Sequence, residues 1–132
     1  MIVYAVMLID RDSGKVIFKV GHTQKKIAER FSGEEYNRFI IQRIDHIYFS
    51  REDWQEAKHL ALKIEYEALK GFKKPSTFII EDYLGIERGD LNDATGKPLS
   101  GITEMFVLET EEQRHKFEQH FKNIKLLYHE GN

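Results

Sequence analysis

Residues 2–20 have the sequence IVYAVMLIDRDSGKVIFKV, and this stretch decides the fold. A continuous aliphatic run at 2–9 precedes turn-forming residues at 10–14, and a second β-branched and aromatic run follows at 15–20. Two apolar runs joined by a short cluster of Asp, Ser and Gly are typical of a β-hairpin. The sequence therefore predicts two antiparallel strands at the start of the chain.

The segment between the hairpin and residue 50 is predicted to hold two short helices and a third strand. Thr23 can cap a helix that begins near Gln24. Residues 34–43 are expected to form the second helix, and the β-branched and aromatic run at 44–49 the third strand. The sheet is therefore predicted to contain the hairpin and this strand.

The clearest helix begins after Ser50, which forms a capping-box pattern with Asp53. Its apolar positions recur at spacings of three and four residues, and Gly71 followed by Pro75 marks its end. These positions are Trp54, Ala57, Leu60, Ala61, Ile64, Ala68, Leu69 and Phe72. They predict one long amphipathic helix packed against the sheet.

The C-terminal part is predicted to begin with a long polar loop at 89–101. A strand at 103–108 follows, and then a helix that opens with a capping box at 110–113 and extends to about Asn123. Residues 124–128 are expected to add an edge strand. These elements predict an α+β fold with a small, mostly antiparallel central sheet flanked by helices and a C-terminal strand–helix extension.

Composition and length indicate an ordinary globular protein. The chain has 132 residues, 20 Lys and Arg against 22 Asp and Glu, and 41% hydrophobic residues, so we expect a single domain over 1–132, with its core at 2–75 and its extension at 76–132. The absence of cysteine excludes disulfide scaffolds, thiolate zinc sites and cysteine nucleophiles. The apolar run at 1–9 is too short to cross a membrane and lacks signal-peptide features, which predicts a cytoplasmic protein with no membrane partner.

Glu65 lies on the face of the long helix that should be buried, beside Ile64 and Ala68. A buried carboxylate without a partner is costly. Glu65 therefore either reaches solvent from the edge of the stripe, pairs with a buried cation, or serves as a metal ligand or acid–base group. Glu67 lies between Lys63 and Lys70 on the solvated face, and we assign it no function.

Residues 19–23, with the sequence KVGHT, place a cation, a glycine, an imidazole and a hydroxyl where a strand meets a helix. Such a junction suits phosphate binding, although Gly and Thr also occur there for capping alone. Arg30 follows on the expected first helix, with Lys25 and Lys26 nearby. A lone arginine on a short helix is usually solvated. These residues therefore indicate a functional site only when they are taken together.

In combination, these residues resemble the motifs of the GIY-YIG nuclease superfamily over roughly residues 2–75. Lys19 stands where many members have Tyr, as in phage-type members with a Lys-Ile-Gly motif. A restriction-enzyme branch combines such a Lys with a His three residues on and an Arg eleven residues on, here His22 and Arg30. The other matching positions are Val3-Tyr4, Val20-Gly21 with Thr23, and Glu65 with Ala68, Leu69 and Pro75. The chain also departs from the family pattern. Ile2 replaces the first Gly, and Ser76 and Thr77 stand where many members have Asn.

The resemblance implies a GIY-YIG-like fold and a Mg²⁺-dependent endonuclease that cleaves DNA, of restriction, phage or repair type. It implies that Tyr4 deprotonates the attacking water, Arg30 binds the scissile phosphate and Glu65 holds one Mg²⁺, which Mn²⁺ can replace. The products would carry a 5′-phosphate and a 3′-hydroxyl. Lys19 would favour the phenolate of Tyr4 by its charge if the hairpin register places both on one face, and His22 would hydrogen-bond the phenol or the water.

The charge distribution points to a local DNA-binding surface. Eight Lys and Arg against four Asp and Glu at 11–43 give +4, whereas two against nine at 81–112 give −7. The acidic segment is expected to lie away from the DNA or to limit nonspecific binding. The candidate DNA-binding residues are Thr23, Lys25, Lys26, Arg38, Lys70, Lys73 and Lys74.

Two other interpretations stay open at this point. A catalytically inactive GIY-YIG-like module could hold nucleic acid or a protein partner without cutting. Alternatively, the likeness could be accidental and the protein an α+β interaction domain. Because little chain remains outside the catalytic core, target recognition would come from the loop at 89–101, the C-terminal helix, a homodimer or partner subunit, or structure in the DNA itself.

Overall fold

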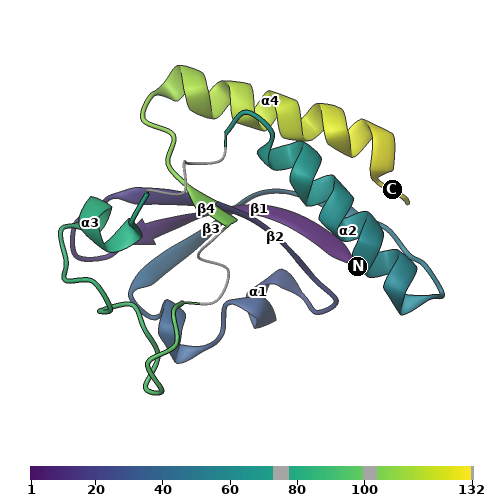
Figure 1. Ribbon diagram of the computed structural model, residues 1–132. Coiled ribbons are helices and arrows are strands. Elements are labelled where there is room, and N and C mark those ends of the chain that lie inside the picture. Colours follow the sequence, from purple (N-terminus) through teal and green to yellow (C-terminus); the bar gives the residue numbers. More distant parts are fainter. Residues whose placement is uncertain (73–77, 100–103, 132) are drawn as a thin grey trace.

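The predicted N-terminal hairpin is confirmed. The computed structural model describes residues 1–72, 78–99 and 104–131 (Figure 1). In it, β1 (Ile2–Asp10) pairs antiparallel with β2 (Val16–Thr23). The turn between the strands uses Gly14 at φ +74°, a left-handed conformation that glycine adopts without strain.

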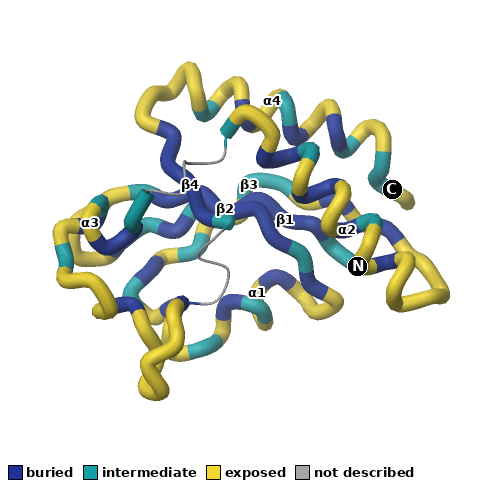
Figure 2. Tube along the Cα trace, viewed as in Figure 1, coloured by how far each residue is buried: buried dark blue, intermediate teal, exposed yellow. Residues whose placement is uncertain are grey.

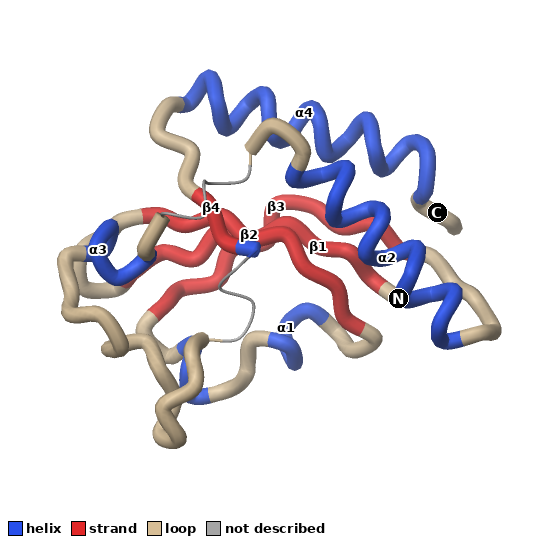
Figure 3. The backbone as a smooth tube through the Cα atoms, viewed as in Figure 1, coloured by secondary structure: helices blue, strands red, loops and turns tan. Residues whose placement is uncertain are grey.

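The hairpin is the centre of a four-stranded antiparallel sheet in the described part of the chain. β3 (Phe39–Tyr48) pairs with β1, and the short β4 (Met105–Phe106) pairs with β2, so the strand order is β3-β1-β2-β4. Figure 3 shows this sheet between helices on one side and a mixture of short helices and loops on the other. The fold is α+β, as expected from the sequence.

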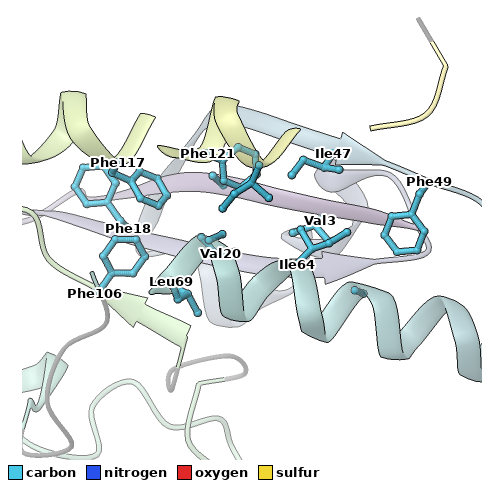
Figure 4. Packing of buried hydrophobic residues seen from close by; sticks show 14 of the residues in the cluster. Val3, Phe18, Val20, Ile47, Phe49, Ile64, Leu69, Phe106, Phe117 and Phe121 are labelled. Carbon is cyan, nitrogen blue, oxygen red and sulfur yellow. The ribbon is translucent and has the colours of Figure 1, made fainter. Parts of the chain in front are cut away.

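The two long helices cover one face of the sheet. α2 (Trp54–Leu69) packs across β2, and α4 (Glu111–Tyr128) packs across β3 and beside α2 (Figure 1). Alternate strand residues point to this face because successive side chains of a strand point in opposite directions. They form an apolar cluster with the helices; Figure 4 labels Val3, Phe18, Val20, Ile47, Phe49, Ile64, Leu69, Phe106, Phe117 and Phe121.

The opposite face is covered by α1 (Ile27–Arg30), a 3₁₀ turn η1 (Glu34–Tyr36) and α3 (Ile80–Leu84). The apolar cluster on this face also includes residues from the segment after α3 and from β4. Figure 2 shows that buried and exposed stretches alternate along the segments that cover this face. The strand residues of this cluster are Tyr4, Val6, Leu8, Ile17, Phe39 and Met105. Lys19 belongs to the same face and is also buried.

The helix predicted at 34–43 is wrong. Only η1 is helical there, and β3 already begins at Phe39. The register between β1 and β3 shifts between Ala5 and Val6, which pair with Asp45 and Arg43, so Ile44 is the extra residue of a bulge. The bulge interrupts the alternation of inward and outward side chains, which is why the sequence pattern separated residues 34–43 from the strand predicted at 44–49.

The edge strand predicted at 124–128 is also wrong, because α4 continues to Tyr128. Ile124 is buried in the core cluster between α4 and the sheet, while Leu126 and Leu127 are exposed. The capping box at Thr110 is confirmed: its hydroxyl accepts from the Gln113 backbone N–H, and the Gln113 side-chain oxygen accepts from the Thr110 backbone N–H. The sequence therefore predicted where α4 begins but not where it ends.

Smaller differences concern the other helix boundaries. α1 begins at Ile27, and Thr23 is the last residue of β2 rather than a helix cap. The cap of α2 is Asp53, whose carboxylate accepts from the Gln55 N–H, rather than Ser50. Trp54, expected on the buried stripe, is 54% exposed at the first turn of α2, where the sheet no longer lies beneath the helix.

In the C-terminal half, the sequence did not predict α3. Residues 85–99 form the irregular segment expected from the loop at 89–101, and residues 100–101 lie outside the described part. Of the strand predicted at 103–108, Met105 and Phe106 pair with β2, and Thr103 lies outside the described residues. Within the described residues, no helix has both the length and the apolar character needed to cross a membrane.

Candidate active site

Tyr4 and Lys19 are diagonal neighbours across the β1–β2 hairpin. The register pairs Tyr4 with Gly21 and Val6 with Lys19, so both side chains point to the same face, as the proposed site requires. Tyr4 is 0% and Lys19 is 1% exposed. The Lys19 ammonium donates a hydrogen bond of 2.8 Å to the Tyr4 hydroxyl, which joins two titratable groups inside the fold.

Gly21 makes room for this pair. A Cβ atom at position 21 would overlap the Tyr4 hydroxyl, would lie 2.7 Å from Tyr4 Cζ and would come within 3.0 Å of Lys19 Nζ. Its backbone does not have a positive φ angle, so the close approach of Tyr4 is the reason that glycine fits here. The glycine of the Lys19-Val20-Gly21 motif therefore has a steric role in this chain.

Burial disfavours the charged forms of Lys19 and Tyr4 and shifts the pKa of each side chain. It lowers the pKa of Lys19 from 10.5 to about 8, with Arg30 acting in the same direction and the carboxylates of Glu104 and Glu65 opposing it. It raises the pKa of Tyr4 well above 10, while Arg30 opposes that rise. The phenol of Tyr4 is therefore neutral at neutral pH in the free protein, and the expected effect of Lys19 on its ionisation stays a prediction.

His22 and Glu65 form the second pair of the site. The Nδ1 atom of His22 lies 2.7 Å from Oε1 of Glu65, and the side chains are 26% and 6% exposed. His22 lies opposite Val3 and so points to the face covered by α2, from which Glu65 approaches. Glu65 is therefore buried with His22 as its partner, and its service as a metal ligand stays a prediction.

Arg30 completes the group from the opposite face. Its guanidinium lies 5.6 Å from the ring centroid of Phe31 and 5.8 Å from that of Tyr36, and it hydrogen-bonds the Tyr36 hydroxyl. Phe31 in turn packs edge-on against both Tyr4 and Tyr36. Arg30 therefore adjoins Tyr4 through aromatic contacts, and its charge acts on Tyr4, Lys19 and Glu104.

Glu104 is a member of the site that we did not predict. Its Oε2 atom lies 3.7 Å from Lys19 Nζ, and the side chain is 32% exposed. Burial and the nearby charge of Glu65 raise the pKa of Glu104, while Lys19, His22 and Arg30 oppose that rise. The acidic segment therefore does not lie wholly away from the site.

The candidate DNA-binding residues occupy different places. Thr23 and Lys25 line a groove of about 500 Å³ that also borders His22 and Arg30. The other two described lysines are exposed at helix boundaries: Lys26 precedes α1, and Lys70 follows α2. Lys73 and Lys74 lie outside the described residues.

Arg38 is not brought to the site. Its Nε atom donates a hydrogen bond of 2.7 Å to the buried carboxylate of Asp10, and its Nη2 atom lies 3.5 Å from Asp12. Asp10 lies six residues from Tyr4 along β1, which corresponds to roughly 20 Å. Arg38 therefore neutralises a buried acid at the turn end of the hairpin.

The donor set suits a cation that needs few protein ligands. Glu65 offers one carboxylate, and the described residues contain no group of three or more His, Cys, Asp or Glu side chains arranged around a common point. Mg²⁺ is commonly held by one or two carboxylates, with water and substrate phosphate completing its octahedron. Glu65 is therefore compatible with Mg²⁺ and, by the same oxygen chemistry, with Mn²⁺.

Comparisons of the chain with protein-family models, with curated proteins and with solved structures found no match.

Proposed function

We propose that this protein is a Mg²⁺-dependent endonuclease of GIY-YIG type that hydrolyses DNA phosphodiester bonds. The observation that carries the proposal is the gathering of Tyr4, Lys19, His22, Arg30 and Glu65 around one end of β2, from both strands of the hairpin and from α1 and α2. Perturbed titratable groups that share a partly buried position are typical of active sites.

The geometry supports a division of roles. Arg30 binds the scissile phosphate and stabilises the charge that grows on it. Glu65, oriented by His22, would hold the metal, and Mg²⁺ bound there would supply charge stabilisation for the departing oxygen. The expected products carry a 5′-phosphate and a 3′-hydroxyl.

The hydrogen bond between Lys19 and Tyr4 supports a proton relay as the base. Tyr4 accepts a proton from the attacking water while its own hydroxyl proton passes to the neutral amine of Lys19. The resulting hydroxide attacks phosphorus, and the proton ends on Lys19 Nζ. This route avoids a free phenolate, which the raised pKa of Tyr4 disfavours. It needs unprotonated Lys19, so cleavage is expected to rise with pH through about 8.

The test incubates purified protein with supercoiled plasmid, branched DNA and RNA, in Mg²⁺, Mn²⁺ or EDTA. We expect metal-dependent DNA cleavage that is lost in Tyr4→Phe and in Glu65→Gln. If the wild type cleaves no substrate faster than Glu65→Gln does, the enzymatic proposal is overturned. Binding without cleavage would then favour the inactive nucleic-acid-binding module.

A further inference from the structure

The groove beside the candidate site has an aromatic wall that the proposed roles leave unused. Trp54 is its largest exposed apolar side chain, at 54% exposure, and lies at the start of α2. Lys58 lies one turn further along the helix, and its Nζ atom is 5.0 Å from the centroid of the indole ring. The ammonium helps to position the ring by a cation–π contact, while more than half of the residue stays exposed.

The remaining walls of the groove are predominantly basic. Lys25, Arg30 and Lys58 contribute cations, and Glu29 is the one carboxylate among the lining residues that the structure describes. His22 and Arg30 belong both to the groove and to the candidate site, so whatever enters the groove reaches the proposed scissile phosphate. Basic side chains along a channel suit a phosphate backbone.

The combination of basic side chains with an exposed ring selects among nucleic-acid structures. Bases in a duplex are stacked on each other and offer no free face, whereas an unpaired base can stack on an aromatic side chain. We propose that the groove binds an unpaired DNA strand next to the cleavage point, with one base stacked on Trp54 and its phosphates on Lys25 and Lys58. The substrate class is then DNA with a single-stranded flank, such as a flap or branch. The proposal rests on the endonuclease function for its link to cleavage, but the binding can be measured alone.

The experiment uses the intrinsic fluorescence of the protein, because Trp54 is the single tryptophan of the chain. The Glu65→Gln variant in EDTA is titrated with three DNAs of matched sequence: single-stranded, blunt duplex and flap duplex. We expect the fluorescence to be quenched by single-stranded and flap DNA and to change little with blunt duplex. No quenching by any DNA, or equal quenching by all three, would overturn the proposal.

Variants separate stacking from charge. Trp54→Ala in the same background is expected to weaken flap binding about tenfold, and Trp54→Phe to restore most of the affinity, since a base can stack on either ring. Lys58→Ala should weaken binding of every DNA and reduce the salt dependence by about one charge. Tyr66→Ala is the matched control, because Tyr66 is an exposed aromatic residue of the same helix that does not line the groove. Affinities for these variants come from anisotropy of labelled DNA.

The outcomes distinguish this inference from the proposed function. If the wild type cleaves flap DNA but Trp54→Ala binds and cleaves it as well as Tyr66→Ala does, the stacking inference fails and the endonuclease stands. If no DNA is cleaved, yet single-stranded and flap DNA quench Trp54 and lose affinity in Trp54→Ala, the groove stands and the endonuclease proposal fails.

Discussion

The β1–β2 hairpin buries one charged side chain at its turn end and another in the candidate site towards its other end, but the two surroundings stabilise charge very differently. At the turn end, Asp10 is 0% exposed and accepts hydrogen bonds from Arg38 and Ser13. Burial opposes its ionisation, yet these hydrogen bonds hold the pKa of Asp10 below its usual 3.8. In the candidate site, Lys19 lies opposite Val6 in the middle of the hairpin and its ammonium reaches Tyr4 towards the open end. It is equally buried, and burial outweighs its acidic neighbours and lowers its pKa to about 8.

The difference in pKa shift indicates that Asp10 has a structural role and Lys19 a reactive one. A buried charge with complete hydrogen bonding keeps its ordinary charge state and fixes local geometry. A buried charge whose ionised form is disfavoured can exchange protons near physiological pH, which is useful in catalysis and costly for stability. We therefore expect changes at the turn end to affect stability, and changes at the other end to affect DNA cleavage.

The largest expected effect on stability is that of Arg38→Ala. It leaves the Asp10 carboxylate buried without its cation, which should lower the free energy of unfolding by about 3–5 kcal/mol. The measurement is urea unfolding at several pH values. Because the folded pKa of Asp10 is depressed, its stabilising contribution is present above pH 3.8 and is lost as the pH falls through the folded value. The gap between wild type and variant should therefore narrow in acid.

The contrast between the turn end and the candidate site is contradicted if Arg38→Ala loses as much DNA cleavage per folded molecule as Glu65→Gln does. The turn end would then belong to the functional site after all. Arg38→Lys serves as the control that keeps the charge, and its loss of stability should be smaller because the two-atom contact with Asp10 becomes a single one.

Glu65→Gln is the corresponding change at the other end. It should reduce cleavage about 10²–10³-fold, equivalent to about 3–4 kcal/mol in the barrier, because the metal loses its carboxylate. Glu67→Gln on the same helix is the control and should cleave as the wild type does. Initial rates at saturating Mg²⁺ and the thermal midpoint measure the two effects. A large fall in the midpoint with little change in rate would assign Glu65 a structural role.

Lys19→Met tests whether the buried ammonium is destabilising. Unfolded Lys19 keeps its proton to about pH 10.5, whereas folded Lys19 releases it near 8, so the unfolded state binds more protons between these values and wild-type stability rises with pH. Relative to Lys19→Met, the wild type should gain about 2 kcal/mol from pH 8 to 10.

The same titration curves provide a control for Lys19→Met. Lys122→Met, at an exposed position of α4, should show no such gain. A flat difference between the wild type and Lys19→Met over this pH range would show that Lys19 is not held in a costly charged state, and the contrast with Asp10 would disappear.

Gly21→Ala has the smallest expected effect on stability. Overlap of the new methyl group with Tyr4 costs about 1–3 kcal/mol, and the reduced freedom of the unfolded chain offsets about 0.4–1 kcal/mol of it. A net loss of about 1 kcal/mol is therefore expected in chemical unfolding. Gly33→Ala is the control, because there the methyl group meets only the exposed side chain of Glu35. Equal losses in both variants would remove the steric argument for Gly21.

The sequence was most informative where one local pattern determines the structure. Two apolar runs joined by a turn cluster predicted the hairpin, and the capping box predicted the start of α4. The common face of Tyr4 and Lys19 depended on the hairpin register, which the structure supplies. Prediction from the sequence failed where tertiary context overrides local pattern. The bulge at Ile44 disguised the first half of β3, and the sheet beneath α4 extended the helix over residues 124–128.

The candidate site was predictable only as a set of motif residues. The spacing of Lys19, His22 and Arg30 could be read along the chain, but the partners of these residues depend on three-dimensional contacts. Sequence could not show that Glu104, the residue before β4, approaches Lys19, because the two residues are 85 positions apart. Nor could it show that Arg38 pairs with Asp10, since a basic residue in a basic segment looks available for DNA.

The position of Met1 bears on how the protein should be prepared. Met1 lines the groove beside His22, and its ammonium donates to the Phe49 carbonyl, while the Phe49 N–H donates back to the Met1 carbonyl. Extra residues joined ahead of Met1 would lie beside the groove. The binding and cleavage assays should therefore compare protein tagged before residue 1 with protein tagged after residue 132.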